Sequence, residues 1–228
     1  MPGPLAGIKV IDFSAVISGP LSSMILADQG ADVIKIEAPG RSDLLRKEWY
    51  SRGGLTSMFV NCNRGKRSVV VDLQTEKGLE VAYSLCDEAD VVLENFRPGV
   101  MERLKVGPED LHSRNPRLVY CRISGYGQTG PWSGKRAYDP VTQAVTGYVA
   151  IQNNPEVPIP DLVRNALVDK ATAYSAAQAI TAALLARERG EQGQTIALSL
   201  MDAGLAFLWP DGMMKNTMLG EGTREGPA

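Results

Sequence analysis

Short apolar runs and segments of helical spacing alternate along the first part of the chain. The first apolar run is Ile8–Phe13, and apolar residues then recur at helical spacing over Leu21–Ile25 before Gly30 ends the helix. A second apolar run, Asp32–Glu37, follows. A strand, a helix and a second strand in this order form a βαβ unit, whose strands are parallel and whose crossover is right-handed. The pattern therefore predicts an α/β fold.

Four later apolar runs predict further strands of the same sheet, at residues 68–72, 90–94, 117–122 and 194–198. Helices are expected over Thr75–Cys86, over the alanine-rich segment Lys170–Arg187 and over Met201–Trp209. Because the centres of these strands are apolar, we expect a mostly parallel sheet that helices cover on both faces.

Two long segments show neither pattern. Residues 38–67 are rich in Gly, Arg and Ser, and residues 124–139 contain the run Ser-Gly-Tyr-Gly-Gln-Thr-Gly-Pro. Loops of this length in a compact domain are usually functional or mobile, so we expect a small-molecule site built from loops. Residues 220–228 are typical of a linker or a frayed tail.

The composition excludes several classes of protein. Lys and Arg number 24 against 26 Asp and Glu, so no general basic field attracts nucleic acid or an anionic membrane surface. Cys62, Cys86 and Cys121 fit neither a disulfide framework nor a metal cluster, and we expect reduced thiols and no metal. The sequence shows no signal peptide and no apolar run of about 18 residues. We therefore expect a cytoplasmic protein that binds neither nucleic acid nor membranes.

The first strand-to-helix turn argues against a dinucleotide site. Gly19 and Pro20 permit a tight turn, but the Gly-x-Gly-x-x-Gly pattern that lets a backbone approach a pyrophosphate is absent. Glu37 ends the second strand, where an NAD-binding carboxylate often lies, yet without the glycines a solvent-exposed strand end is the simpler interpretation. The sequence patterns of serine hydrolases, zincins, P-loop proteins and zinc sites are absent as well.

Asp169 lies just before the long alanine-rich helix and has two interpretations. Its side chain can cap the first amides of the helix, where the helix dipole favours the ionised form. Alternatively, a carboxylate that is already ionised near pH 7 can attack an activated acyl group, such as a thioester, without a separate base. Position alone favours the N-cap.

The charged side chains elsewhere carry little information by themselves. Arg97, Arg103, Lys135 and Arg136 lie around predicted turns, and the segment 63–68 holds three more cations. Scattered Lys and Arg are usually solvated surface. The single histidine, His112, lies at a polar helix end, and we assign it no catalytic role.

An ordered set of motifs resembles the family III CoA-transferases, a group that also contains the α-methylacyl-CoA racemases. Each motif alone is weakly specific, whereas the set extends in order over most of the chain. The motifs are Leu5–Ser14, Gly19-Pro20, Leu26–Glu37 with Pro39-Gly40, Asn63–Ser68, Glu94–Gly99, Gly125–Pro131, Tyr138-Asp139, Asp169–Thr172, Gly190–Gln194 and Asp202-Ala203.

The resemblance implies a Rossmann-like large domain that binds coenzyme A. It implies further that Asp169 attacks an acyl-CoA thioester to form a mixed anhydride, after which a small carboxylic acid takes over the CoA; this favours the nucleophile over the N-cap. Cations would bind the phosphates of CoA, and apolar residues would face its adenine or pantetheine. The residues implied to contact CoA are Val16, Ile17, Leu73, Asn95, Phe96, Arg97, Arg103, Arg136 and Tyr138.

The racemases differ at one motif, because they carry His-Asp where this chain has Tyr138-Asp139. Racemisation needs two groups that exchange protons on opposite faces of a carbon. Tyrosine, with a reference pKa of about 10, is a poor replacement for histidine in that role. The resemblance therefore favours a transferase over a racemase.

The chain is shorter than members of this family, which usually continue through a small domain. We expect residues 1–205 to form the CoA-binding large domain, residues 206–228 to form a helix and tail, and the usual small domain to be lacking. The resembling proteins form interlocked dimers; we expect a homo-oligomer, but not that interlocked form. Three functions stay open: an acyl-CoA-dependent transferase, a non-catalytic CoA-binding or assembly module, and an NAD-type oxidoreductase domain, which the first turn disfavours.

Overall fold

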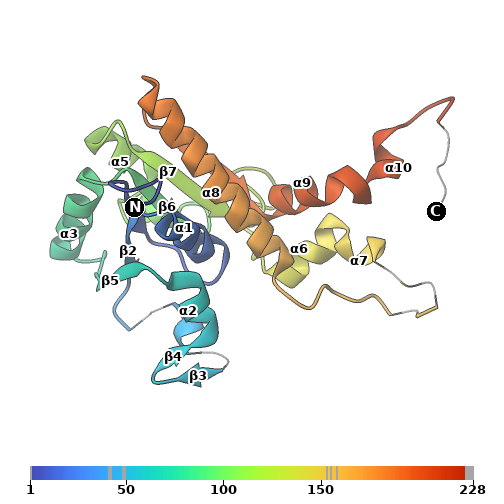
Figure 1. Cartoon of the computed structure of the whole chain (residues 1–228), viewed down its shortest axis with the longest axis horizontal. Helices are drawn as coiled ribbons and strands as arrows, with labels where there is room; N and C mark the ends of the chain where they lie inside the picture. The colour runs from blue at the N-terminus through green and yellow to red at the C-terminus, as the bar shows by residue number, and fades with distance from the viewer. Residues whose placement is uncertain are drawn as a thin grey trace.

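Six parallel strands form the central sheet in the computed structural model, which describes residues 2–40, 43–47, 50–152, 154, 156–157 and 159–223 (Figure 1). Their spatial order is β5-β2-β1-β6-β7-β8. Numbered along the chain, these strands follow the 3-2-1-4-5-6 order of a Rossmann sheet. The strands are β1 Lys9–Asp12, β2 Asp32–Glu37, β5 Lys66–Val70, β6 Val91–Glu94, β7 Val119–Ser124 and β8 Thr195–Ser199.

Helices cover both faces of this sheet, as the apolar strands predicted. One face packs against α1 (Ser18–Asp28) and the long α8 (Leu167–Glu188), which lie side by side in Figure 1. The other face packs against α3 (Glu76–Asp87), α4 (Val100–Arg103) and α5 (Pro108–Arg114). The α/β prediction is therefore confirmed.

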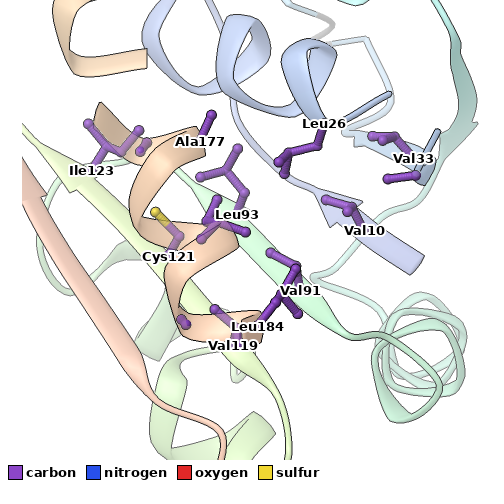
Figure 2. Close-up of a cluster of buried hydrophobic side chains, with 14 residues drawn as sticks. Val10, Leu26, Val33, Val91, Leu93, Val119, Cys121, Ile123, Ala177 and Leu184 are labelled. Atoms are coloured by element: carbon purple, nitrogen blue, oxygen red, sulfur yellow. The ribbon is translucent and has the colours of Figure 1, made fainter. Parts of the chain in front are cut away.

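Successive residues of each strand supply the two cores in turn. On β6, Val91 and Leu93 point toward α1 and α8 (Figure 2). Val92, between them, belongs to the core cluster on the opposite face, which includes residues of α3. The side chains of α1 and α8 that meet them in Figure 2 are Leu26, Ala177 and Leu184. A pleated strand directs neighbouring side chains to opposite faces, which explains why the central strands read as continuous apolar runs.

The prediction that residues 38–67 lack regular structure is wrong. A 3₁₀ turn, η1 (Leu44–Arg46), is followed by the short antiparallel pair β3 (Ser51–Arg52) and β4 (Leu55–Thr56) and by helix α2 (Ser57–Asn63). Helix α2 is too short to show a periodic signal, and its stability comes from tertiary packing. The prediction for residues 124–139 is confirmed except at its two ends, where Ser124 ends β7 and Asp139 begins the next helix; residues 125–138, all of which the structure describes, contain no helix or strand.

The C-terminal third adds helices beside the end of the sheet. These are α6 (Asp139–Thr146), α7 (Tyr148–Ile151), α9 (Leu200–Gly212) and α10 (Met214–Thr217), and α9 packs on α6 and α8 while extending away from the sheet (Figure 1). The helix predicted over Met201–Trp209 is confirmed as part of α9. Of the predicted tail, residues 224–228 lie outside the described residues. In the described part of the chain, no helix combines the length and the apolar character needed to cross a membrane.

Candidate active site

A cavity of about 310 Å³ opens at the carboxyl ends of β1, β6 and β7. Within the sheet, β2 lies next to β1 in one direction, whereas β6 and β7 follow β1 in the opposite direction. This reversal between β1 and β6 is the topological switch point, where open α/β sheets bind their ligands. The lining residues include Val16, Ser18, Leu44, Asn95, Phe96, Arg97, Ser124, Lys135, Tyr138, Asp139 and Asp169.

The turn after β1 forms one wall of this cavity and has an unusual backbone. Val16 has a φ of 70°, a left-handed conformation that a β-branched residue rarely adopts. Its neighbour Ala15 exchanges two hydrogen bonds with the Asn95 side chain, at 2.9 and 2.7 Å. A Cβ added at Gly19 would lie 2.2 Å from the Cβ of Ser14, so only glycine allows α1 to begin so close to the turn.

Asp169 lies inside the first turn of α8 rather than before it. The helix begins at Leu167, its N-cap residue is Ala166, and no side chain caps it, so the interpretation of Asp169 as a plain N-cap is wrong. The helix starts earlier than predicted because Val168 is fully buried in a small core with Tyr148 and neighbouring helices. This placement brings Asp169 to the cavity wall, together with Val16 and Asn95.

A second carboxylate, Asp139, anchors the nucleophile candidate. Its Oδ2 accepts the main-chain N–H of Asp169 at 2.8 Å, and its Oδ1 accepts Nε2–H of Gln143 at 2.5 Å. The Gln143 side chain also bonds with the backbone of Val163 and Asn165, and so fixes the segment that leads into α8. Asp139 belongs to the Tyr138-Asp139 motif, but the sequence analysis did not identify it as a site residue. Its position next to Tyr138, a predicted CoA contact, could have indicated it.

The pKa of Asp169 is raised to about 7. Burial is the main cause, and the negative charge of Asp139 adds to it, while a hydrogen bond with the Ser18 hydroxyl opposes both. The expectation of a fully ionised carboxylate at pH 7 is therefore wrong, because burial and the charge of Asp139 disfavour the ionised form. Once ionised, a carboxylate with a raised pKa is a more basic nucleophile, and such shifts are common at functional sites.

The structure brings together five of the nine residues predicted to contact CoA. Val16, Asn95, Phe96, Arg97 and Tyr138 all line the cavity. The other four lie outside its lining, and their contacts with CoA stay predictions. Ile17 is buried in a small core with residues of α2, Leu73 packs on the second core, and Arg103 and Arg136 are exposed.

Two charged side chains that were predicted to be exposed are buried. Glu37 accepts hydrogen bonds from Arg46, at 2.5 Å to Nη2, and from the N–H of Asp43 at 2.9 Å. It therefore ties η1 to β2 instead of ending the strand in solvent. Lys66, counted among solvated cations, has its Nζ 2.9 Å from Oδ2 of the fully buried Asp12. The partner of Lys66 lies 54 residues away along the chain, and the partners of Glu37 lie in the irregular segment that follows β2. The local pattern of residues indicated neither pairing.

The cavity lining carries charged side chains of both signs beside apolar ones. Among the residues that the structure describes, no group of three or more His, Cys, Asp or Glu side chains is arranged to hold a metal. The cavity border combines the cations Arg97 and Lys135 with the apolar side chains of Val16, Leu44 and Phe96. His112 does not line it, and its Nε2 lies 3.0 Å from the carbonyl oxygen of Leu118.

The fold and the site define an α/β protein with a Rossmann-type sheet and an acidic group at the ligand-binding edge. A family model described as CoA-transferase family III matches residues 5–228. This match covers nearly the whole chain, and the chain therefore belongs to CoA-transferase family III.

Similar proteins agree with this assignment. The "Probable fatty acyl-CoA transferase Rv3272" of Mycobacterium tuberculosis is 42% identical over 90% of this chain and 52% of its own length. An acetyl-CoA:oxalate CoA-transferase of Acetobacter aceti is 41% identical over 90% of this chain and 53% of its own length. The crystal structure of a CaiB/BaiF family protein from Brucella suis is 36% identical, with a TM-score of 0.88, over 93% of this chain and 57% of its own. The chain thus spans about half the length of the curated relatives it matches.

Proposed function

We propose that this chain forms the CoA-binding part of an enzyme that moves CoA from an acyl-CoA to a small carboxylic acid, with Asp169 as the nucleophile. The single observation that carries the proposal is the position of Asp169, which lines the cavity at the switch point of the sheet. Relatives named for acetyl-CoA and oxalate, and for succinyl-CoA and glutarate, support a carboxylic acid as the acceptor.

The proposed chemistry begins at the Asp169 carboxylate. One of its oxygens attacks the thioester carbonyl, the carbon–sulfur bond breaks, and CoA leaves as a thiolate while an acyl-aspartyl anhydride forms. The thiolate then attacks the aspartyl carbonyl, which releases the donor acid and leaves an aspartyl-CoA thioester. The acceptor carboxylate attacks this thioester, displaces the thiolate and forms a second anhydride. The thiolate finally attacks the acceptor acyl carbon of that anhydride, which gives the new acyl-CoA and restores the Asp169 carboxylate.

The residues around Asp169 match the parts of this substrate. Arg97 and Lys135 provide charge-assisted hydrogen bonds for phosphate oxygens, and Arg103 and Arg136 are exposed cations on the neighbouring α4 and loop. Val16 and Phe96 offer apolar surface to the pantetheine chain. The Asp139 carboxylate holds the backbone of Asp169 in place without occupying its side chain.

The test is intact-protein mass spectrometry after the chain is mixed with a panel of acyl-CoAs and hydroxylamine, which converts activated aspartyl groups to a stable hydroxamate. We expect label on the unmodified chain and none on Asp169→Asn, which keeps the shape of the side chain. Asp161→Asn is the matched control, because Asp161 is an exposed acid outside the cavity lining whose carboxylate contacts Arg164 and the main-chain N–H of Leu162.

Equal labelling of the unmodified chain and Asp169→Asn, or no labelling with any acyl-CoA, would contradict the role of Asp169. Calorimetry with CoA separates the remaining outcomes. Binding of CoA without labelling would favour the non-catalytic CoA-binding module, and the absence of binding would contradict both functions.

A further inference from the structure

Two lysines are buried beneath the turn that connects β1 to α1. Lys35, on β2, is 1% exposed, and the side chain of Lys66, on β5, is 2% exposed. A buried ammonium group is costly unless it is paired and hydrogen-bonded. Both lysines meet this condition, and their partners all lie in or beside residues 12–20 or in the segments that pack on them.

Lys35 acts on the first half of the turn. Its Nζ donates a hydrogen bond to the carbonyl oxygen of Ser14 at 2.6 Å and lies 3.1 Å from Oδ2 of Asp43, which is equally buried. The other oxygen of Asp43 accepts the main-chain N–H of Val16 at 3.1 Å and that of Leu45 at 3.0 Å. The charge pair therefore holds the backbone on both sides of Ala15.

Lys66 fixes the second half in the same way. Its Nζ bonds with Oδ2 of Asp12 at 2.9 Å and with the carbonyl oxygen of Pro20 at 2.8 Å. Asp12 also accepts the N–H of Ser14 at 2.8 Å and the hydroxyl of Ser23 at 2.6 Å. Although burial acts to raise it, the pKa of Asp12 stays far below its usual value because Lys66 and Lys35 are close.

The turn needs such support because of Val16. A left-handed conformation at a β-branched residue persists only where the surroundings over-determine it. The same turn provides Val16 and Ser18 to the cavity wall that Asp169 also lines, and Ser18 acts to lower the pKa of Asp169. The conformation of the turn therefore decides both the shape of the wall and the position of Ser18 relative to the nucleophile candidate.

We propose that Lys35 is a positioning residue that acts through Asp43 to hold residues 14–18 in the conformation that binds CoA. Lys35 itself does not line the cavity. The inference rests on the proposed function for the identity of the ligand. The hydrogen-bond arrangement on which it depends is independent of that identity.

Lys35→Met tests the proposal, since methionine fills a similar volume without the charge. Without Lys35, the turn can leave the strained conformation at Val16, and CoA binding must then restore that conformation. We therefore expect the Kd for CoA, measured by calorimetry, to rise about tenfold. We also expect faster amide hydrogen exchange at Val16 with unchanged exchange at Val91 and Val92 in the sheet. Lys9→Met is the matched control, because Lys9 lies on β1 and pairs with Glu88 at the surface.

Asp43→Ala shows whether Lys35 acts through Asp43. The single variants should raise the Kd to similar extents, and the double variant should raise it no further. If Lys35→Met does not fold, Lys35→Met with Asp43→Asn replaces it, because this pair leaves no unpaired charge. Three results would overturn the proposal. They are an unchanged Kd in a folded variant, a rise in the Kd of the double variant equal to the product of the two single rises, and hydrogen exchange at Val91 and Val92 that becomes faster by as much as at Val16.

The result separates this inference from the proposed function. If the unmodified chain does not bind CoA, the proposed function fails, while hydrogen exchange at Val16 still tests the hold of Lys35 on the turn. If the unmodified chain binds CoA and Lys35→Met binds it equally well, only the present inference fails.

Discussion

Asp169 owes its chemical character to burial and to neighbours from two separate segments. Burial and the charge of Asp139, at the start of α6, raise its pKa, and the hydroxyl of Ser18, in the first turn of α1, lowers it. The sequence indicated Asp169 through its motif. It did not indicate the balance of these effects, because both neighbours are more than 25 residues away along the chain.

This balance predicts the pH dependence of acyl labelling. Only the carboxylate attacks a thioester, so the labelling rate should rise with pH and reach half its maximum near pH 7. Asp139→Asn removes the negative neighbour and keeps an oxygen that can accept the N–H of Asp169. Its midpoint should therefore move to lower pH, as measured by quenched labelling from about pH 5 to about pH 9. A midpoint that stays in place or moves upward would contradict this assignment of causes.

At the scale of elements, the sequence predicted the strands and helices that have a clear apolar periodicity. Strand β2 matches its predicted bounds, and the long helix α8 differs only at its ends. Helix α2 was missed because it is held by contacts rather than by pattern: Arg46 lies 3.9 Å over the Phe59 ring, and Phe59 packs with Ile17 and Leu45. Such contacts join segments whose proximity only the folded chain reveals.

The cap of α2 offers a prediction at this scale. The hydroxyl of Thr56 accepts the N–H of Phe59 at 3.1 Å and also donates to the carbonyl oxygen of Leu45, in a buried position. Thr56→Ala should lower the free energy of unfolding by about 2 kcal/mol, at the upper end for a lost cap. Thr75→Ala is the control, because Thr75 caps α3 in an exposed position and should cost only about 1 kcal/mol. The Thr75 hydroxyl also donates to a carbonyl oxygen, that of Asp72, so the two caps differ mainly in burial. Equal losses in urea unfolding would show that burial adds nothing to the contribution of the Thr56 cap.

At the scale of the whole molecule, the fold was predictable and the assembly of the site was predictable only in part. The alternation of apolar runs and helices predicted the parallel sheet, and the resemblance to the family indicated Asp169 and five further residues of the cavity wall. The sequence did not distinguish Lys35 and Lys66 from solvated surface lysines. Their burial depends on Asp43 and Asp12, which the sheet and its crossovers bring beneath the same turn.

The charge distribution predicts how salt affects binding. The chain has a net charge of −2, yet Arg97 and Lys135 line the cavity. We expect CoA binding to weaken about threefold to tenfold when NaCl increases from about 0.05 to about 0.5 M, because screening acts on these exposed cations. Calorimetry at several salt concentrations measures this slope. Lys135→Ala should reduce it, whereas Lys9→Met should not.

The switch point of the sheet also has a consequence for the order of folding. The cavity wall combines residues that follow β1, β6 and β7 with Asp169 of α8, so it joins the first tenth of the sequence to its last third. No local hairpin or single crossover can form such a site, and the closure of long loops makes parallel sheets slow to assemble. A newly made chain therefore gains its ligand-binding surface only after the two halves of the sheet have joined, and ligand binding reports on the completion of folding.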